Sequence, residues 1–233
     1  MRKGLTEVVF ILDRSGSMRG LEEDTIGGFN SMIEKQRKEE GEVLISTVLF
    51  DSQCEVLYDR VPADKIEPMN DSQYYVRGCT ALLDAIGGAI HHIANVHKYA
   101  REEDRPEKTL FIITTDGMEN ASRCYTYDKV KRMVEKEKQK YGWEFLFLGA
   151  NIDAIQVAAR FGIGADRALN YESDSAGTVL NYQVLSETVS AVCRSRNREE
   201  MNEAFSCCDP IREDYRRRPE FLWHCRSVPS KVV

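Results

Sequence analysis

Two apolar runs, hardly interrupted by polar residues, constrain the fold most. Residues 8–12 read VVFIL, and residues 108–117 read KTLFIITTDG. A half-exposed strand alternates apolar and polar residues, whereas continuous runs such as these are typical of strands buried on both faces. Each run ends abruptly at an aspartate, Asp13 in the first case and Asp116 in the second. The chain is therefore expected to contain a sheet that is covered on both sides.

Strand-like and helix-like segments alternate along most of the chain. Apolar residues at helical spacing predict helices over residues 21–39, 80–100, 127–140, 152–161 and 175–194, and further strands are expected at 42–50, 55–61, 143–150 and 168–171. This alternation indicates an α/β domain with a mainly parallel central sheet and helices on both sides. Only DSQC separates the strands at 42–50 and 55–61, so these two must pair antiparallel, with the second at an edge.

The domain organisation follows from length and from where the alternation stops. A chain of 233 residues suits one ordinary domain, and we assign residues 1–195 to it. Residues 196–233 are charged and irregular, and they are expected to form an appendix with a short helix or two, packed by Phe205, Phe221 and Trp223.

Charge and apolar content argue against two classes of partner. The 38 acidic and 32 basic residues are scattered and give a net charge of −6, whereas proteins that neutralise phosphates usually carry a basic surplus. No apolar run approaches the length of a membrane span, and the first run is too short for the core of a secretion signal. We therefore expect neither nucleic acid nor a membrane as a partner; the oligomeric state is not predictable from the sequence.

The cysteines point to a reducing compartment. Seven cysteines form an odd set without regular spacing, as expected in the cytoplasm. A zinc site can be assembled from Cys207, Cys208, His224 and Cys225, although adjacent cysteines chelate one ion poorly and no Cys-x-x-Cys pair is present. The histidines at 91, 92 and 97 lack the four-residue spacing of a helical zinc pair and are expected at the surface.

Oxygen-bearing side chains cluster at the expected carboxyl ends of the buried strands. Ligands of open parallel sheets bind beyond these ends, where the winding of the chain reverses. If the strands ending at Asp13 and Asp116 are neighbours there, their carboxylates share one crevice with Ser15 and Ser17 of the turn DRSGSM, and Thr80 of GCTAL can reach it. These hard oxygen donors suit Mg²⁺, Mn²⁺ or Ca²⁺ rather than zinc.

Each of these turns also has a simpler interpretation. Serine, threonine and aspartate commonly cap helices, and Thr80 stands directly before a predicted helix. Asp84, one helical turn further, either supports the site or faces solvent. Glu119 and Asn120 either shape partner choice or simply form a loop. Three such turns at the ends of the right elements favour the cation site.

The same segments resemble a known family. DRSGS matches Asp-x-Ser-x-Ser, GCTAL matches the Gly-x-Thr segment and TTDG matches the final Asp-Gly of the von Willebrand factor A (vWA) domain, and the resemblance covers residues 5–195. It implies an intact metal-ion-dependent adhesion site (MIDAS) on a Rossmann-like α/β/α sandwich, with a six-stranded, mostly parallel sheet and one antiparallel edge strand. Within this family, the chain resembles the prokaryotic or phage-type intracellular members that consist of a single domain.

The resemblance also implies roles for individual residues. Ser15 and Ser17 would ligate the cation directly, Thr80 and Asp116 directly or through water, and Asp13 mainly through water while it holds the loop. In this family a Glu or Asp of a partner protein typically fills the sixth metal position.

Three functions remain open from the sequence. The leading hypothesis is a metal-dependent protein-binding module that is not an enzyme. A magnesium- or manganese-assisted phosphate-ester hydrolase is the second, although the motif segments contain no evident nucleophile with a base. The third is an accessory subunit of an ATP-driven, chelatase-like machine, which the resemblance implies because relatives of the vWA domain work beside ATPases. The chain has no Gly-x-x-x-x-Gly-Lys-Ser/Thr loop, so we do not expect it to supply the nucleotide site itself.

Overall fold

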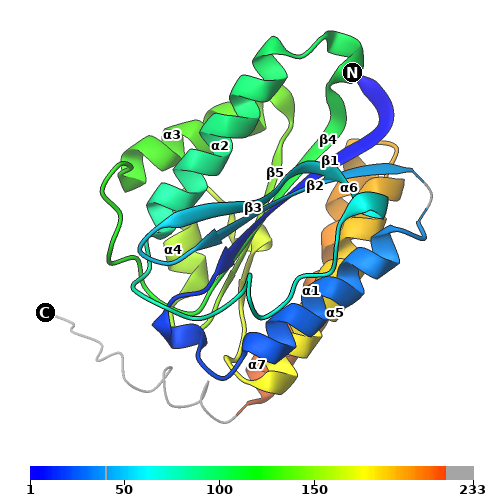
Figure 1. The fold of residues 1–233 in the computed structure, drawn as a ribbon. Coiled ribbons are helices and arrows are strands. Elements are labelled where there is room, and N and C mark those ends of the chain that lie inside the picture. The colour runs from blue at the N-terminus through cyan, green and yellow to red at the C-terminus, as the bar shows by residue number, and fades with distance from the viewer. Residues whose placement is uncertain (40, 219–233) are drawn as a thin grey trace, which may run out of the picture.

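A computed structural model of the protein describes residues 1–39 and 41–218, and these residues form one six-stranded sheet between two layers of helices (Figure 1). The strands are β1 (Arg2–Asp13), β2 (Glu42–Phe50), β3 (Cys54–Pro62), β4 (Pro106–Thr115), β5 (Glu144–Gly149) and β6 (Ala168–Asn170). The helices are α1 (Glu22–Gln36), α2 (Leu82–Tyr99), α3 (Tyr127–Tyr141), α4 (Ala154–Arg160), α5 (Ser175–Arg194), α6 (Arg198–Ala204) and α7 (Asp209–Arg217).

Burial on both faces explains the uninterrupted apolar sequence of β1. Val8, Phe10 and Leu12 point into a core shared with α1 and α5, whereas Val9 and Ile11 point into a second core shared with α2, α3 and α4. Figure 1 shows the two groups of helices on opposite sides of the sheet. The expected three-layer α/β/α architecture is confirmed.

The strand order creates a switch point at the centre of the sheet. The order is β3-β2-β1-β4-β5-β6, and every pair is parallel except β2 with β3. The chain first winds from β1 toward β2 and β3, and it later returns to place β4 on the other side of β1. The strands that deliver Asp13 and Asp116 are therefore neighbours, as predicted, and β3 is the antiparallel edge strand.

Glu7 is a fully buried carboxylate within the apolar β1. Its oxygens lie 2.5 Å from Arg60 Nε and 2.5 Å from His97 Nε2. The register of the β2–β3 pair shifts beside Arg60, which has a φ of 53°, and this irregularity turns the guanidinium toward Glu7. A cation and an imidazole thus compensate the charge that Glu7 brings into the strand.

Residues 198–217 pack on the domain. Helices α6 and α7 flank a 3-10 turn at Phe205–Cys208, and their buried side chains join the core beneath α5: Ala204, Phe205, Cys208 and Ile211. The boundary at residue 195 stays a prediction, although no break in packing marks it. Phe221 and Trp223, which were expected to pack the appendix, lie outside the described residues.

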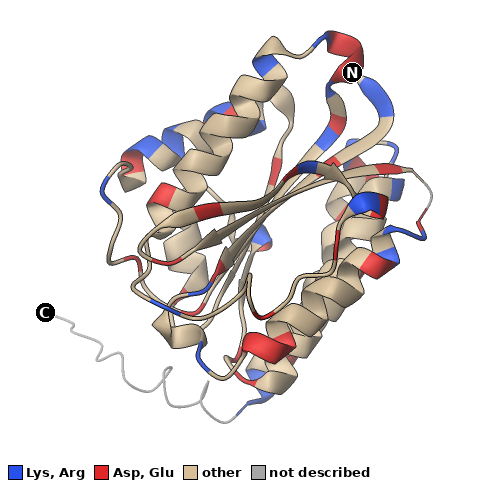
Figure 2. Ribbon diagram, viewed as in Figure 1, with Lys and Arg blue, Asp and Glu red and all other residues tan. Residues whose placement is uncertain are grey.

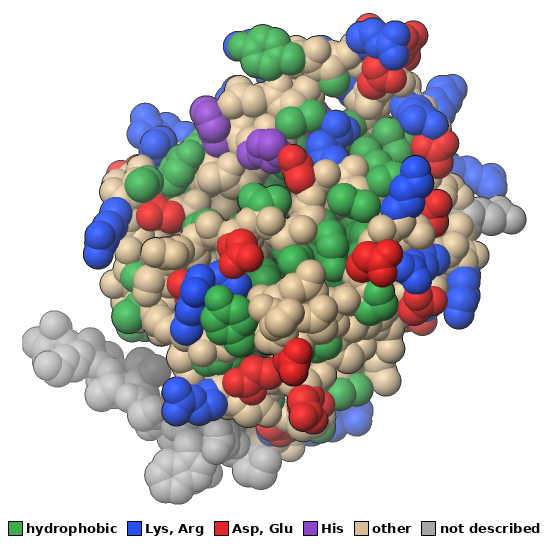
Figure 3. Space-filling model, in the orientation of Figure 1, with side chains coloured by type: hydrophobic (Ala, Val, Ile, Leu, Met, Phe, Trp, Pro, Cys, Tyr) green, Lys and Arg blue, Asp and Glu red, His purple; other side chains and the backbone are tan. Residues whose placement is uncertain are grey.

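The surface mixes charges of both signs. Acidic and basic residues are spread over helices and loops (Figure 2), and on the face seen in Figure 3 hydrophobic side chains lie scattered among them. In the described part of the chain, no helix is both long enough and apolar enough to cross a membrane.

Candidate functional site

Asp13 ties the end of β1 to the end of β4. Its Oδ1 accepts a hydrogen bond from the Ser15 backbone N–H at 2.7 Å, and its Oδ2 accepts one from Thr115 Oγ1 at 2.6 Å. The Asp116 backbone N–H lies 3.4 Å from the same Oδ2. The carboxylate therefore fixes the serine turn against the strand that carries Asp116.

Three hydroxyls converge beside this carboxylate. Ser15 Oγ lies 3.1 Å from Ser17 Oγ, and Thr80 Oγ1 donates to Ser15 Oγ at 3.1 Å. Ser15 and Thr80 are buried, whereas Ser17 is exposed, so the cluster opens to the surface through Ser17. A Cβ on Gly117 would stand 3.4 Å from Ser17 Oγ and 3.7 Å from Thr80 Oγ1, so Gly117 borders the hydroxyl cluster.

Thr80 does not cap the helix that follows it. The N-cap position of α2 is Ala81, and Glu119 Oε2 accepts from the Leu83 backbone N–H at 2.8 Å in the first turn. The capping interpretation of Thr80 is therefore wrong: Thr80 is not the N-cap residue, and its hydroxyl donates to Ser15.

The carboxylate of Asp116 is held by two further loops. It accepts hydrogen bonds from Asn151 Nδ2, in the loop after β5, and from Ser173 Oγ, in the loop after β6. All five residues predicted for the cation site thus lie at one end of the sheet, at the carboxyl ends of β1 and β4 and in the turn before α2. Their roles as ligands remain predictions.

The carboxyl groups of Asp13 and Asp116 both have raised pKa values in the folded protein. Burial raises the pKa of the Asp13 carboxyl above its ordinary value, against hydrogen bonds from Thr115 and Ser15. Burial also raises the pKa of Asp116, against hydrogen bonds from Ser173 and Asn151, and the Asp13 charge adds to the rise. Charged forms that are this costly to bury are stabilised by a nearby cation.

The donor set fits a hard divalent cation. Three neutral hydroxyls beside two carboxylates match the oxygen preference of Mg²⁺, Mn²⁺ and Ca²⁺. Within residues 1–39 and 41–218, no group of three or more His, Cys, Asp or Glu side chains is arranged to hold a metal ion. In the alternative zinc set, Cys208 is buried beside Thr188, and His224 and Cys225 lie outside the described residues.

The loop after Asp116 is anchored by residues whose roles the sequence left open. Both oxygens of Asp84 accept backbone hydrogen bonds from residues 123–125, at 2.8 and 2.9 Å. Glu119 accepts from Ala121, Ser122 and Leu83, and Asn120 Oδ1 accepts from the Thr80 backbone N–H at 2.9 Å. Asp84 therefore supports the loop that borders the site, and Glu119 is engaged internally.

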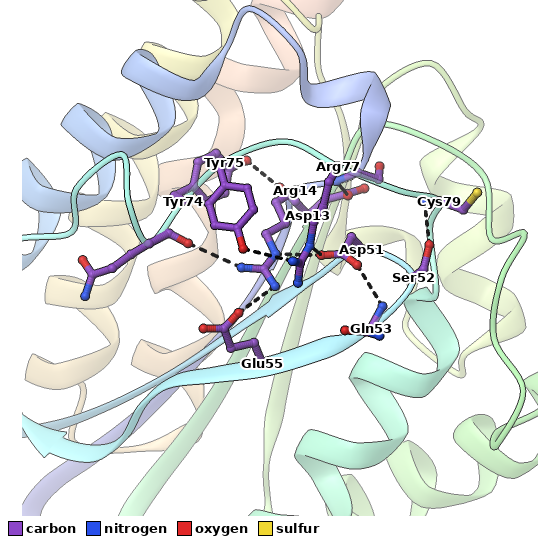
Figure 4. Close-up of polar contacts among 12 residues, drawn as sticks. Asp13, Arg14, Asp51, Ser52, Gln53, Glu55, Tyr74, Tyr75, Arg77 and Cys79 are labelled. Atoms are coloured by element: carbon purple, nitrogen blue, oxygen red, sulfur yellow. Dashed lines mark hydrogen bonds and ion pairs between the residues drawn. The ribbon is translucent and has the colours of Figure 1, made fainter.

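A buried arginine between Asp13 and Ser15 was not identified from the sequence. Arg14 is fully buried; its Nε donates to Asp51 at 2.8 Å and its Nη2 to Glu55 at 2.8 Å (Figure 4). Arg77 Nε donates to the same Asp51 oxygen at 2.9 Å, and the Tyr75 ring contacts both guanidinium groups. This network fixes Arg14, and with it the serine turn, to residues that follow β2 and begin β3.

The network was detectable in principle. Asp51 follows β2 in the same way that Asp116 follows β4, so a third aspartate lies at the carboxyl ends of the parallel strands. Gly78 has a φ of 69°, and its carbonyl accepts from the Gly16 backbone N–H at 3.2 Å, which brings the loop with Tyr75 and Arg77 alongside the serine turn. Burial would raise the pKa of the Asp51 carboxyl, but hydrogen bonds from Arg77 and Arg14 lower it overall.

Comparison with protein-family models and with curated proteins finds no match. Among solved structures, the chain is similar to a von Willebrand factor type A protein from Catenulispora acidiphila, with a TM-score of 0.52, 14% identity, and coverage of 80% of this chain and 42% of that one. It is also similar to proximal thread matrix protein 1 from the mussel byssus, in a structure whose MIDAS motif is occupied by zinc, with a TM-score of 0.54, 15% identity, and coverage of 81% and 46%.

A third structure is the vWF domain of the type V pili tip protein Mfa5 from Porphyromonas gingivalis, with a TM-score of 0.56, 11% identity, and coverage of 82% of this chain and 97% of that one. The chain thus spans less than half of the Catenulispora and mussel proteins and nearly all of the Mfa5 domain. At these identities the similarity concerns the fold. The chain has a vWA-like, Rossmann-type α/β fold.

Proposed function

We propose that this protein is a cation-dependent protein-binding module, in which a divalent cation held at the hydroxyl cluster captures an Asp or Glu side chain of a partner. One observation carries the proposal: beside buried Asp13, Ser15 Oγ lies 3.1 Å from Ser17 Oγ of its own loop and 3.1 Å from Thr80 Oγ1 of a separate loop. Helix capping does not account for this convergence.

The residue types explain why such a site would bind an acidic group. Ser15, Ser17 and Thr80 contribute no charge, so only Asp13 and Asp116 offset the charge of a Mg²⁺, Mn²⁺ or Ca²⁺ ion. A cation with weakly donating, neutral ligands keeps its attraction for a further carboxylate. The zinc in the MIDAS motif of the mussel protein supports divalent metal binding at this position of the fold.

The location of the site supports a macromolecular partner. The cluster reaches the surface through Ser17, and exposed Met118 follows Gly117 on its rim. A partner's acidic side chain can therefore approach from outside without a deep cavity. We further propose a reducing compartment such as the cytoplasm, on the basis of the odd number of cysteines.

Affinity capture with and without cation tests the proposal. Immobilised wild-type protein is incubated with source lysate in Mg²⁺ and, in parallel, in chelator. The expected result is a partner that is retained only with Mg²⁺, is lost with Ser15→Ala, and is unaffected by Ser31→Ala, which alters an exposed serine of α1 outside the site. If the chelator and Ser15→Ala both leave the amount of retained partner unchanged, the proposal is refuted.

The same preparations distinguish the hydrolase alternative. Generic phosphate esters are supplied with Mn²⁺, and turnover is followed for wild-type protein and Asp116→Ala. We expect no turnover, and robust hydrolysis that Asp116→Ala abolishes would replace the binding proposal with an enzymatic one.

A further inference from the structure

The Asp116 carboxylate is oriented by two side chains from loops distant in sequence. Asn151 follows β5 and Ser173 follows β6, and each donates to a different oxygen of Asp116, Oδ1 and Oδ2 respectively. Backbone hydrogen bonds fix these loops to the sheet: Ala150 N–H donates to Thr115 O at 3.0 Å, and Tyr171 N–H donates to Gly149 O at 3.2 Å. The two donors are therefore held in place independently of Asp116.

Asn151 adopts a backbone conformation that the nearby helix does not require. Its φ is 57°, in the left-handed region that residues with a side chain disfavour, although Asn tolerates it better than most. The start of α4 is satisfied by other residues, because Asp153 accepts from the Gln156 N–H and Asn170 Oδ1 accepts from the Ala154 N–H. The unfavourable conformation of Asn151 instead directs its amide to Asp116.

The chemistry of the donors separates this arrangement from the neighbouring Asp51. Two guanidinium groups contact Asp51 and compensate its charge. Among the described residues, the side chains that donate to Asp116 are an amide and a hydroxyl, which orient a carboxylate without neutralising it. Each carboxylate oxygen can accept about two hydrogen bonds, so one acceptor position per oxygen remains for a cation or for water bound to it.

We propose that Asn151 and Ser173 are positioning residues, which hold the Asp116 carboxylate in one orientation, with its charge retained, for a divalent cation at the hydroxyl cluster. This inference rests on the proposed function. Residues that orient a metal ligand without touching the metal typically change metal affinity about 10–100-fold when they are replaced.

Mn²⁺ affinity, measured by isothermal titration calorimetry on the full chain, tests the proposal. Asn151→Gly keeps the left-handed backbone accessible but removes the amide, and Ser173→Ala removes the hydroxyl. We expect each to weaken Mn²⁺ binding about 10-fold. Ser173→Thr, which restores a hydroxyl, should recover affinity to within about threefold of wild type. Asn170→Ala loosens the start of α4 without contacting Asp116, and it should leave Mn²⁺ affinity unchanged.

Melting temperatures without metal separate positioning from stability. Asn151→Gly should melt within about 3 °C of wild type, so that its lost affinity does not come from partial unfolding. If wild-type protein binds Mn²⁺ but Asn151→Gly and Ser173→Ala bind equally well, the inference is wrong and the proposed function stands. An equal loss in Asn170→Ala, or no rescue by Ser173→Thr, would also overturn it. Failure of wild-type protein to bind Mn²⁺ would instead contradict the proposed function.

Discussion

Asp51→Asn tests whether one buried carboxylate holds the Arg14 guanidinium, and through it the serine turn. The substitution keeps the size of the side chain and removes its charge. The Arg14 side chain is 0% exposed and that of Asp51 is 3% exposed, so water cannot compensate the guanidinium when this charge is lost. The remaining acidic partner, Glu55, is 52% exposed.

The expected magnitude follows from these exposures. Removing one partner of a buried ion pair costs about 3–5 kcal/mol, because the other charge stays buried without compensation. The Glu55 carboxylate still compensates part of the Arg14 charge, and the contact of Asp51 with the exposed Arg77 adds little because water screens it. We therefore expect Asp51→Asn to lower the free energy of unfolding by about 3 kcal/mol, which corresponds to roughly 6–12 °C in melting temperature.

Urea unfolding followed by circular dichroism measures this loss, with Glu55→Gln as the matched control. Both substitutions remove a carboxylate 2.8 Å from Arg14, but Glu55 is half exposed, so its loss should cost only about 1 kcal/mol. The slope of the urea dependence should not change, since the surface exposed on unfolding is the same. Equal losses for the two variants would refute the argument from burial.

Three further predictions follow from the structure. The pKa of the Asp51 carboxyl is lowered in the folded state, so its charge stabilises the fold at neutral pH. The difference in unfolding free energy between wild type and Asp51→Asn should therefore be complete above about pH 5 and shrink as the pH falls below the ordinary pKa of 3.8. Urea titrations at several pH values measure this difference. In α1, Gly28→Ala would place its Cβ 2.4 Å from the Tyr182 ring and should destabilise the protein by about 1–3 kcal/mol. The Cβ of Gly27→Ala meets nothing within 4 Å, so this variant should stabilise the protein by about 0.5–1 kcal/mol. Thermal denaturation compares the two variants, and the opposite order of stability would contradict the observed packing of α1 on α5. The pKa values of Asp13 and Asp116 are raised, so protons should compete with Mg²⁺ at a higher pH than they do at ordinary carboxyls. The increase in melting temperature caused by Mg²⁺ should therefore become smaller as the pH is lowered. An increase that does not depend on pH would mean that the ion binds elsewhere.

The sheet was predictable because its strands carry an unambiguous pattern. Burial on both faces leaves residues 8–12 of β1 and 110–113 of β4 without polar side chains, and the short connection after β2 permits only an antiparallel partner. These features depend on local sequence alone. The switch point, and with it the meeting of Asp13 with Asp116, follows from parallel winding.

Parts of the site escaped prediction because they depend on contacts between distant loops. Arg14 and Asp51 directly follow the paired residues Asp13 and Phe50 of β1 and β2. Arg77 and Tyr75 join them from a distant loop, which the bend at Gly78 brings against the serine turn. Asn151 and Ser173 carried a usable signal, since both follow parallel strands at the edge where ligands bind, but single polar residues in such loops are too common to select. The alternatives for Thr80 and Asp84 were separable only by their hydrogen-bond partners.

The location of a bound cation tests the central claim most directly. Crystals of the full chain grown with Mn²⁺, and measured near the manganese absorption edge, reveal the ion by its anomalous scattering. The account predicts one strong peak in contact with the side-chain oxygens of Ser15, Ser17 and Thr80, of which Ser15 Oγ already lies 3.1 Å from each of the other two, and no peak there in crystals of Ser15→Ala. A fully occupied peak elsewhere on the molecule, with none at this cluster, would contradict it.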